Sequence, residues 1–230
     1  MCEMSPFDTV EIDRLLSTTK AVRRRLDLAR PVEREVVIDC IRLASYAPNA
    51  SNAQEWKWVV VDEPDLRRAV GEQYRRVTEP VVSKILEHKE ATGDEAGARI
   101  TRSILYLAEH MAEVPVIVLP CYDIAAAGDR YGMWLGASAA PTKMESGMYA
   151  SIYPAVWSFQ LALRSRGLGS AMTTAHQLDQ PAMAEILGIP HTWDQTCLIP
   201  VAYTTGGDFK ASPRRPVTDS IIWNQTAPGA

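Results

Sequence analysis

The sequence predicts a single domain, residues 1–230, that contains both α-helices and β-strands, because no repeat or linker divides it. Three observations lead to this fold class. Apolar residues recur every three to four positions over 36–44, as in a helix with one buried face. Aromatic and β-branched residues fill 56–61, as in a strand. Residues 151–166 are apolar almost all round, which is typical of a helix at a domain centre or in a subunit interface.

Further helices and strands follow from local signals along the chain. Helices are predicted at 7–18, at 31–47 between two prolines, at 66–77, at 81–111 with a break near Gly93, and at 179–187. Strands are predicted at 114–119, ending before Pro120, and at 196–203. Residues 125–147, rich in Gly, Ala and Ser, are expected to be irregular. The apolar tail at 221–223 has no domain of its own to bury it and is expected to pack on a partner chain.

Composition and charge exclude several classes of function. The net charge of -4 argues against a nucleic-acid binder that works by bulk charge, and no apolar stretch is long enough to span a bilayer. No signal peptide is evident, so a cytoplasmic protein is expected. The histidines show no metal-ligand spacing, so no metal is expected. The cysteines, Cys2 apart, lie in apolar runs and are predicted to be buried thiols.

Basic residues at both ends of the chain are the strongest candidates for chemistry. Four cations fall within the six residues 20–25, hereafter the basic stretch, and Arg214-Arg215 come late. Such a run is either a solvated basic face or a phosphate clamp, since guanidinium groups match phosphate oxygens in geometry and charge. Ser51-Asn52, in a polar loop before the strand at 56–61, and Thr173-Thr174 add short polar groups. No nucleophilic triad, Walker loop or dinucleotide fingerprint is present, so no catalytic side chain is assigned.

Four short motifs follow one another in an order that matches a known family. The first two read Thr19-Lys20-Ala21-Val22-Arg23-Arg24 and Ala47-Pro48-Asn49-Ala50-Ser51-Asn52-Ala53-Gln54-Glu55-Trp56. The last two read Gly167-Leu168-Gly169-Ser170, which closes the apolar helix, and Arg214-Arg215-Pro216. With these motifs the sequence resembles the FMN-dependent nitroreductase superfamily over nearly its whole length. That family has patterns like Arg-Arg-Ser-Val-Arg-Arg and Ala-Pro-Ser-Ala-x-Asn-x-Gln-Pro-Trp at the first two motifs.

The resemblance implies that the basic residues bind FMN. Arg23, with Arg24 or Lys20, would hold the FMN phosphate or stabilise negative charge near the pyrimidine edge of the flavin. Arg215, alone or with Arg214, would close on the phosphate from the other side.

The resemblance also implies roles for polar residues, and the sequence departs from the family in places. Thr173 and Thr174 fall where the family places backbone donors near the reactive nitrogen of the flavin. The polar loop would line the flavin, usually from the other subunit, through Pro48, Asn49, Ala50 and Asn52. Thr19 and Ala21 stand where Arg and Ser are usual, which removes two expected phosphate contacts and leaves open whether Lys20 compensates. Glu55 replaces a usual proline.

The fold and activity that the resemblance implies are specific. The fold would be α+β, a three-layer α/β/α sandwich with a mixed central sheet, and the C-terminal tail would be swapped in a homodimer. NAD(P)H would reduce FMN, which would then reduce an electron-poor small molecule such as a nitroaromatic or a quinone, with no protein acid required. Flavin destruction, reductive dehalogenation and flavin sequestration without turnover remain alternatives.

A lid over the flavin is a further hypothesis. Aromatic residues and methionines gather in one part of the chain, namely Tyr131, Met133, Trp134, Met144, Met148 and Tyr149. They would form either a lid or ordinary core and interface.

Overall fold

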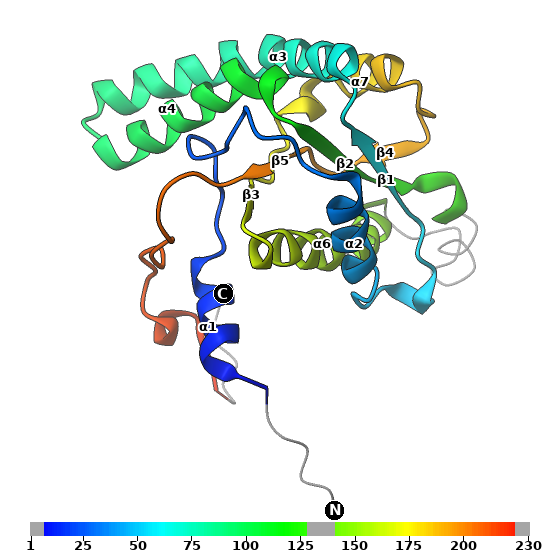
Figure 1. Ribbon diagram of the computed structural model, residues 1–230, viewed down its shortest axis with the longest axis horizontal. Helices are drawn as coiled ribbons and strands as arrows, with labels where there is room; N and C mark the ends of the chain where they lie inside the picture. The colour runs from blue at the N-terminus through cyan, green and yellow to red at the C-terminus, as the bar shows by residue number, and fades with distance from the viewer. Residues whose placement is uncertain (1–6, 128–140, 224–230) are drawn as a thin grey trace, which may run out of the picture.

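One five-stranded sheet lies between two layers of helices in the computed structural model (Figure 1). The model describes residues 7–127 and 141–223, and for 141–145 the backbone alone. The strands are β1 (Trp56–Val61), β2 (Val116–Asp123), β3 (Leu168–Ser170), β4 (Trp193–Gln195) and β5 (Ile199–Tyr203). One side of the sheet carries α3 (Pro64–Ala91), α4 (Glu95–His110) and α7 (Gln180–Leu187). The other side carries α2 (Arg34–Ala44) and α6 (Pro141–Ser165), and α1 (Thr9–Thr18) projects from the body.

The described strands pair in the order β1-β2-β5-β3, with β4 also beside β2. Every ladder between them is antiparallel. The parallel pairing that makes the sheet mixed is confined, within the described residues, to an isolated bridge between Ala21 and Ser170. The α+β class is therefore confirmed. Short 3₁₀ helices complete the description, namely η1 (Ala50–Asn52), η2 (Met111–Glu113), η3 (Ala175–Asp179) and η4 (Val217–Ser220).

Each face of the sheet buries its own hydrophobic cluster. The cluster under α2 and α6 includes Val37 and Phe159, and the cluster under α3, α4 and α7 includes Tyr74 and Leu107. The sheet supplies both clusters because successive residues of β2 point to opposite faces. Three cysteines are free and buried, as predicted: Cys40, Cys121 and Cys197. The apolar helix of the sequence is the central α6, which starts at Pro141.

Two helix predictions need correction. The segment expected to be irregular contains the first turns of α6, and 124–127 is also helical. Residues 128–140, which include three residues of the hypothetical lid, lie outside the described residues. The two helices predicted on either side of Pro80 are one helix, α3. Pro80 is exposed, so water can hydrate the carbonyl that the proline leaves without its helical donor.

Strand β2 was predicted to end before Pro120, but it continues to Asp123. Pro120 lies between the β5 partners, at 116–118, and the β4 partners, at 121–123. Its carbonyl accepts a hydrogen bond from the N–H of Thr196 at 3.0 Å. The missing N–H of Pro120 faces the same side, at the gap between the two ladders, so no ladder bond is lost there.

The three-residue strands β3 and β4 were missed by the sequence analysis. The predicted stop after the apolar helix is correct, because Gly167 has φ +78° and turns the chain. The residues after it enter the sheet, with Gly169 opposite Ala202. A Cβ on Gly169 would lie 3.0 Å from Val22 Cβ, so glycine allows the basic stretch to pack against β3.

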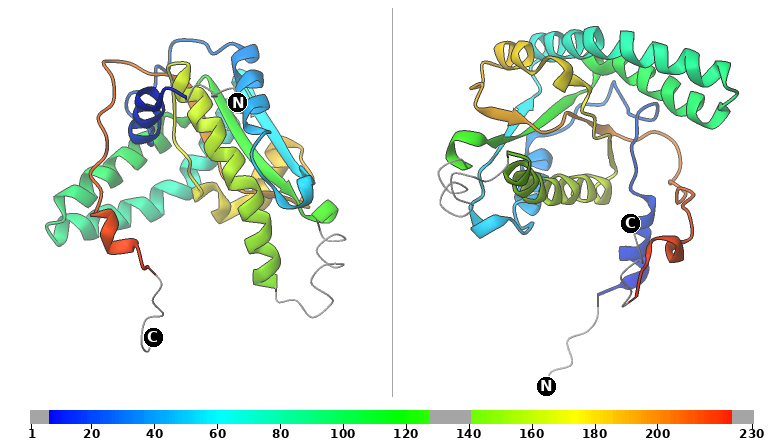
Figure 2. Two further views of the ribbon diagram at one scale, coloured as in Figure 1. Left: turned by 90° about the horizontal axis from the view of Figure 1, so that it is seen from below. Right: turned by 180° about the vertical axis from the view of Figure 1, so that it is seen from behind.

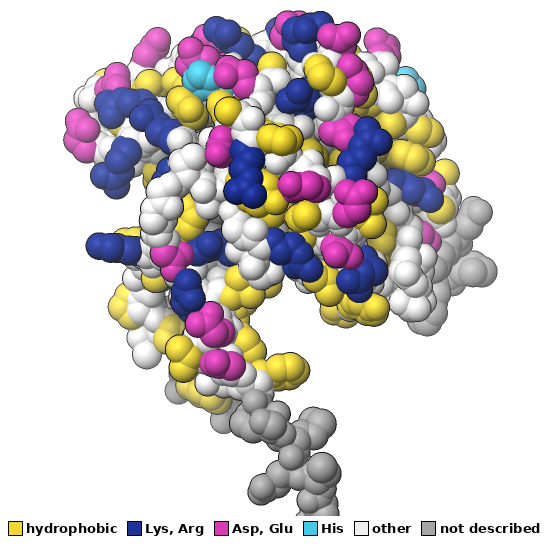
Figure 3. All heavy atoms as spheres, in the orientation of Figure 1, with side chains coloured by type: hydrophobic (Ala, Val, Ile, Leu, Met, Phe, Trp, Pro, Cys, Tyr) yellow, Lys and Arg dark blue, Asp and Glu magenta, His cyan; other side chains and the backbone are white. Residues whose placement is uncertain are grey.

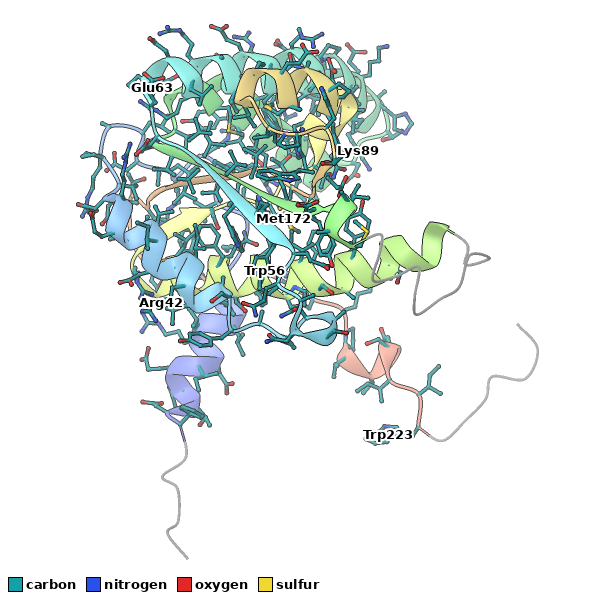
Figure 4. All side chains as sticks on the ribbon, turned by 90° about the vertical axis from the view of Figure 1, so that its right-hand side faces the viewer. Arg42, Trp56, Glu63, Lys89, Met172 and Trp223 are labelled. Carbon is teal, nitrogen blue, oxygen red and sulfur yellow. The ribbon has the colours of Figure 1, made fainter. Side chains whose placement is uncertain are left out.

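The chain leaves the body after β5. Residues 205–210, hereafter the root segment, lead into an arm, residues 211–223, that extends away from the sheet (Figure 2). Figure 4 places Trp223 well outside the body, and its side chain is 77% exposed. Among the described helices, none has both the length and the hydropathy of a membrane span.

Candidate functional site

The basic stretch runs along the edge strand β3. The Val22 N–H donates to the Ser170 carbonyl at 2.8 Å, and Val22 and Leu26 are buried. These contacts anchor the stretch by its apolar residues, so the cations between them point elsewhere. Local sequence supplies the cations, and pairing with β3 fixes where they lie.

The cations of the basic stretch have no acidic partners among the described residues. Elsewhere ion pairs are common, and Asp208 alone pairs with both Arg14 and Arg164. Within the described part of the chain, no ion pair includes the cations of the stretch, which are Lys20, Arg23, Arg24 and Arg25. Positive charge that the protein does not neutralise attracts an anion. This imbalance favours the phosphate-clamp interpretation over a solvated face.

Arg23 is a partly buried cation of this stretch that contacts α4. Its Nη1 donates to Ser103 Oγ on α4 at 3.3 Å, and burial lowers the pKa of its guanidinium. A partly buried guanidinium without a carboxylate has lost hydration that an anionic ligand can replace. Arg24 is exposed, and its guanidinium lies 5.5 Å from the ring centroid of Tyr106.

Lys20 and Arg25 contact the root segment instead. The Nε of Arg25 donates to the Thr205 carbonyl at 2.7 Å, and its Nη2 donates to Gly207. Lys20 Nζ donates to the Lys210 carbonyl at 2.8 Å. The Phe209 ring lies beneath these two cations, 4.0 Å from the Arg25 guanidinium carbon and 5.6 Å from Lys20 Nζ. One of the three N–H donors of the Lys20 ammonium is thus used by the root segment, and the assignment of Lys20 to the phosphate remains a prediction.

Asp208 completes this attachment. It accepts from Arg14 Nη2 at 3.0 Å and from Arg164, at the end of α6, while the Arg164 guanidinium also lies 5.0 Å from the Phe209 ring. Its own neighbour Phe209 donates a backbone N–H to it, and these donors together, the Phe209 N–H foremost, lower the pKa of Asp208 to about 2. The root segment is thus bound to α1, to the basic stretch and to α6.

Replacing Asp208 by asparagine is expected to loosen the root segment. The amide hydrogens of 205–210 should exchange several-fold faster, because Arg14 and Arg164 lose their shared carboxylate. The lowered pKa of Asp208 gives the sign of the pH effect. The stabilisation of the root segment by Asp208 is complete above the ordinary aspartate pKa, about 4, and is lost as pH falls towards 2. Hydrogen exchange read by mass spectrometry checks this, with Asp219→Asn on the arm as control. Equal exchange in wild type and Asp208→Asn would contradict it.

The Thr173-Thr174 pair lies beyond β3 and is only partly available. The Thr173 N–H donates to Leu198 at 3.0 Å, so it is not the free backbone donor that the resemblance implies. The side chain of Thr173 instead meets the hydroxyl of Tyr74, with 2.9 Å between the oxygens. Thr174 is exposed at the N-cap of η3, and its N–H makes no hydrogen bond within the described chain. Of the two, Thr174 can offer a backbone donor.

The polar loop, Pro48 to Gln54, has an unusual backbone. Ser51 and Asn52 have φ of 54° and 51°, and Gln54 has φ of 53°. Such left-handed conformations are costly for residues other than glycine and concentrate at functional sites. Asn49 supports the loop, since its Oδ1 accepts from the Gln54 N–H at 3.0 Å.

One chain does not bring the polar loop and the basic stretch together. The Ala50 N–H donates to Ser151 Oγ near the middle of α6, whereas Arg164 at the C-terminal end of α6 donates to Thr18, just before the basic stretch. Arg164 lies thirteen positions after Ser151 in α6, which is about 20 Å of helix. Figure 1 likewise shows η1 and the basic stretch on different sides of the molecule.

Arg214 and Arg215 also stand apart from the basic stretch. Both are exposed on the arm, and the hydrogen bond that Arg214 makes within the described residues goes to its neighbour Pro213, at 3.0 Å. No hydrogen bond or ion pair in the described chain joins either arginine to Arg23. Their predicted closure on a phosphate remains a prediction.

Comparison with known proteins places the chain in a family. The model of the nitroreductase family matches residues 17–203. The chain belongs to the nitroreductase family. The match begins just before the basic stretch and ends with β5, so it includes the Arg23 and Thr173 region and the polar loop but not the arm.

Two curated relatives within this family carry different names. The chain is 25% identical over 206 residues to iodotyrosine deiodinase of Drosophila melanogaster, which covers 89% of this chain but 66% of that protein. It is 28% identical over 181 residues to 5,6-dimethylbenzimidazole synthase of Rhodobacter capsulatus, covering 76% of this chain and 78% of that protein. The chain therefore spans less than two thirds of the fly relative.

Solved structures confirm the nitroreductase-like fold. A nitroreductase-like protein of Streptococcus mutans aligns with a TM-score of 0.67 at 16% identity, over 94% of this chain and 100% of that one. An oxidised iodotyrosine deiodinase, bound to FMN and 3-iodo-L-tyrosine, aligns with a TM-score of 0.64 at 21% identity, over 92% of this chain and 97% of that one.

Proposed function

We propose that this nitroreductase-family chain binds FMN and passes a hydride from NAD(P)H to an electron-poor small molecule, such as a nitroaromatic or a quinone. The observation that carries the proposal is the partly buried guanidinium of Arg23, which donates to Ser103 and has no acidic partner in the described chain. It also interacts electrostatically with Tyr74, whose hydroxyl meets that of Thr173. An anionic, hydrogen-bonding ligand fits such a place. The FMN in the related deiodinase structure supports the choice of ligand.

The residues of the site fit a flavin mononucleotide. FMN would supply the hydride chemistry, and the protein would bind and orient it. Arg23 would stabilise negative charge at the site, because a cation in a partly dry environment interacts strongly with an anion. Arg24, exposed and without an acidic partner in the described chain, remains free to meet the phosphate, and Thr174 can donate its N–H.

We further propose that a second copy of the chain completes the site. A single chain leaves the polar loop about 20 Å of helix away from the basic stretch, so a homodimer is the direct way to unite them. Exposed apolar side chains support this: Val10 on α1 is 73% exposed, Ile38 on α2 62% and Ile222 on the arm 71%. Figure 3 shows apolar atoms over the projecting part of the molecule. A hollow of about 440 Å³ between α1 and α6, lined in part by Ile12 and Leu15, adds surface that a partner can cover.

The first experiment is an absorption spectrum of the purified protein, followed by anaerobic addition of NADPH or NADH. Flavin bands that bleach are expected, and steady-state oxidation of NAD(P)H should then depend on a quinone or nitroaromatic acceptor. Bound flavin that neither NADPH nor NADH bleaches would favour a sequestering protein or a different electron donor. A colourless protein that FMN cannot reconstitute would contradict the proposal. Light scattering of the same sample tests the homodimer.

Arg23→Gln is expected to weaken FMN binding by about tenfold or more, because charge-assisted hydrogen bonds contribute roughly 1.5–3 kcal/mol. Fluorescence titration of FMN into the apoprotein measures the dissociation constant. Arg68→Gln on α3 is the matched control, because it removes an exposed cation whose partner is Asp65. Equal weakening in both variants would show only a general charge effect.

The names of the relatives favour a second candidate, a different flavin reaction on the same fold. Reductive dehalogenation predicts release of iodide from an iodinated phenol under anaerobic reducing conditions. Flavin destruction predicts irreversible loss of flavin absorbance when the reduced protein meets oxygen. Neither outcome is expected if the proposed acceptor reduction is the activity of this chain.

A further inference from the structure

Tyr74 of α3 is buried beneath the candidate site without belonging to any motif of the sequence. Its side chain has 0% exposure, and its hydroxyl meets the hydroxyl of Thr173, which is 99 residues away in the chain. A buried phenol needs a hydrogen-bond partner, and here it has one that belongs to the candidate site. The contact therefore ties α3 to the turn between β3 and η3.

A second hydroxyl lies one helical turn along. Thr78 is fully buried, and its Oγ1 makes no well-formed hydrogen bond within the described chain. Burial raises the pKa of Tyr74, while Thr173, Thr78 and the positive charge of Arg23 lower it by less. The phenol therefore stays protonated near neutral pH. If Tyr74 donates to Thr173, the Thr173 hydrogen is free to donate to a ligand.

The charge of the basic stretch also acts on Tyr74. Arg23 acts on Tyr74 electrostatically and reaches α4 through Ser103. Helices α3 and α4 pack against each other along their length, so Tyr74 and Ser103 belong to one support. Arg23 and Thr173 come from segments about 150 residues apart. Tyr74 forms a hydrogen bond with Thr173 and interacts electrostatically with Arg23.

We propose that Tyr74 is a positioning residue for the cofactor site, in which its hydroxyl holds the Thr173 side chain in register with Arg23. The inference rests on the proposed function, because the ligand positioned is FMN. Without the hydroxyl, Thr173 would be free to change rotamer, and the site would have to order it when the ligand binds. The consequence is weaker binding with an intact fold.

Tyr74→Phe keeps the ring and removes the hydroxyl, so it is the variant to make. The dissociation constant of FMN, titrated into the apoprotein, should rise about fivefold, as expected for one net hydrogen bond. Thr173→Val should have a similar effect, and Thr173→Ser should restore most of the affinity. Tyr203→Phe is the control, because it removes a hydrogen bond of 2.8 Å to Glu33 outside the site.

The double variant Tyr74→Phe/Thr173→Val decides whether the two hydroxyls act as one unit. Its dissociation constant should rise about fivefold, rather than the roughly 25-fold of independent effects. The flavin reduction potential and visible spectrum, together with melting of the apoprotein, separate positioning from folding. Additive effects, or a Tyr74→Phe variant that melts lower but binds FMN like wild type, would overturn the assignment alone. A wild-type protein that does not bind FMN would overturn the proposed function and this inference together.

Discussion

Phe159→Ala is expected to lower the free energy of unfolding by about 3–5 kcal/mol, as truncation of a buried aromatic side chain does. Phe159 lies in the central helix α6 with 0% exposure. Its ring packs against Trp58 of β1, with 5.3 Å between ring centroids. Alanine would remove this contact and leave a cavity between the helix and the sheet. The loss is a large part of the roughly 5–15 kcal/mol that holds a domain together.

Chemical denaturation followed by circular dichroism measures this effect. Phe159→Leu is the control, because it keeps most of the apolar volume and should cost about 1.5 kcal/mol or less. A much larger loss of unfolding free energy in Phe159→Ala than in Phe159→Leu shows that the cavity causes it, whereas similar losses would show that α6 tolerates no substitution at this position. If Phe159→Ala unfolds at the denaturant concentration of wild type, the packing of α6 described above is wrong.

Acidification from pH 6.5 to pH 4 is expected to cost the folded protein about 3 kcal/mol through His176 alone. His176 is 1% exposed, and burial lowers its pKa to about 4. Its Nε2 lies 3.2 Å from the Gln195 carbonyl and must donate to it, while Nδ1 has no partner in the described chain. A second proton on Nδ1 would therefore bury a charge without an acceptor.

The sign follows from proton binding. Between pH 4 and about 6.5 the unfolded chain binds a proton at His176 that the folded chain does not, so stability falls as pH falls. The stability that neutral His176 contributes is complete above about pH 6.5. Denaturation at several pH values, in wild type and His176→Gln, measures the effect, because carboxylates titrate alike in both. Parallel curves of unfolding free energy against pH for the two proteins, between about pH 4 and 6.5, would contradict the prediction. The stabilisation by Asp208 is lost at lower pH and does not overlap with most of this range.

Much of the fold could be predicted from sequence, for a local reason. The strand β1 was predicted with its observed bounds, because aromatic and β-branched residues are flanked by polar ones. The helix after Asp179 was predicted from a capping residue and a proline, and Asp179 does cap α7. The short strands β3 and β4 could not be predicted, because three residues carry no periodicity and are held only by partners elsewhere.

The candidate site divides in the same way. The order of the motifs along the chain was enough to predict Arg23, Thr173 and the polar loop as site residues, because residue type and motif order can be read from the sequence. The Tyr74–Thr173 contact and the attachment of Asp208 to Arg14 join residues 99 and 194 positions apart, and no local pattern signals them.

By itself, the sequence determined the family, the central helix and the cations that the site uses. Only the tertiary structure decided what each cation contacts, because Lys20 and Arg25 donate to carbonyls of the root segment while Arg23 contacts α4 and has no acidic partner in the described chain. It also decided that the polar loop contacts the middle of α6, away from the C-terminal end of this helix near the basic stretch. The physical reason is that the charge and the secondary-structure propensity of a residue depend on its type. Which charges are neutralised, and which residues lie close together, depends on how the chain folds.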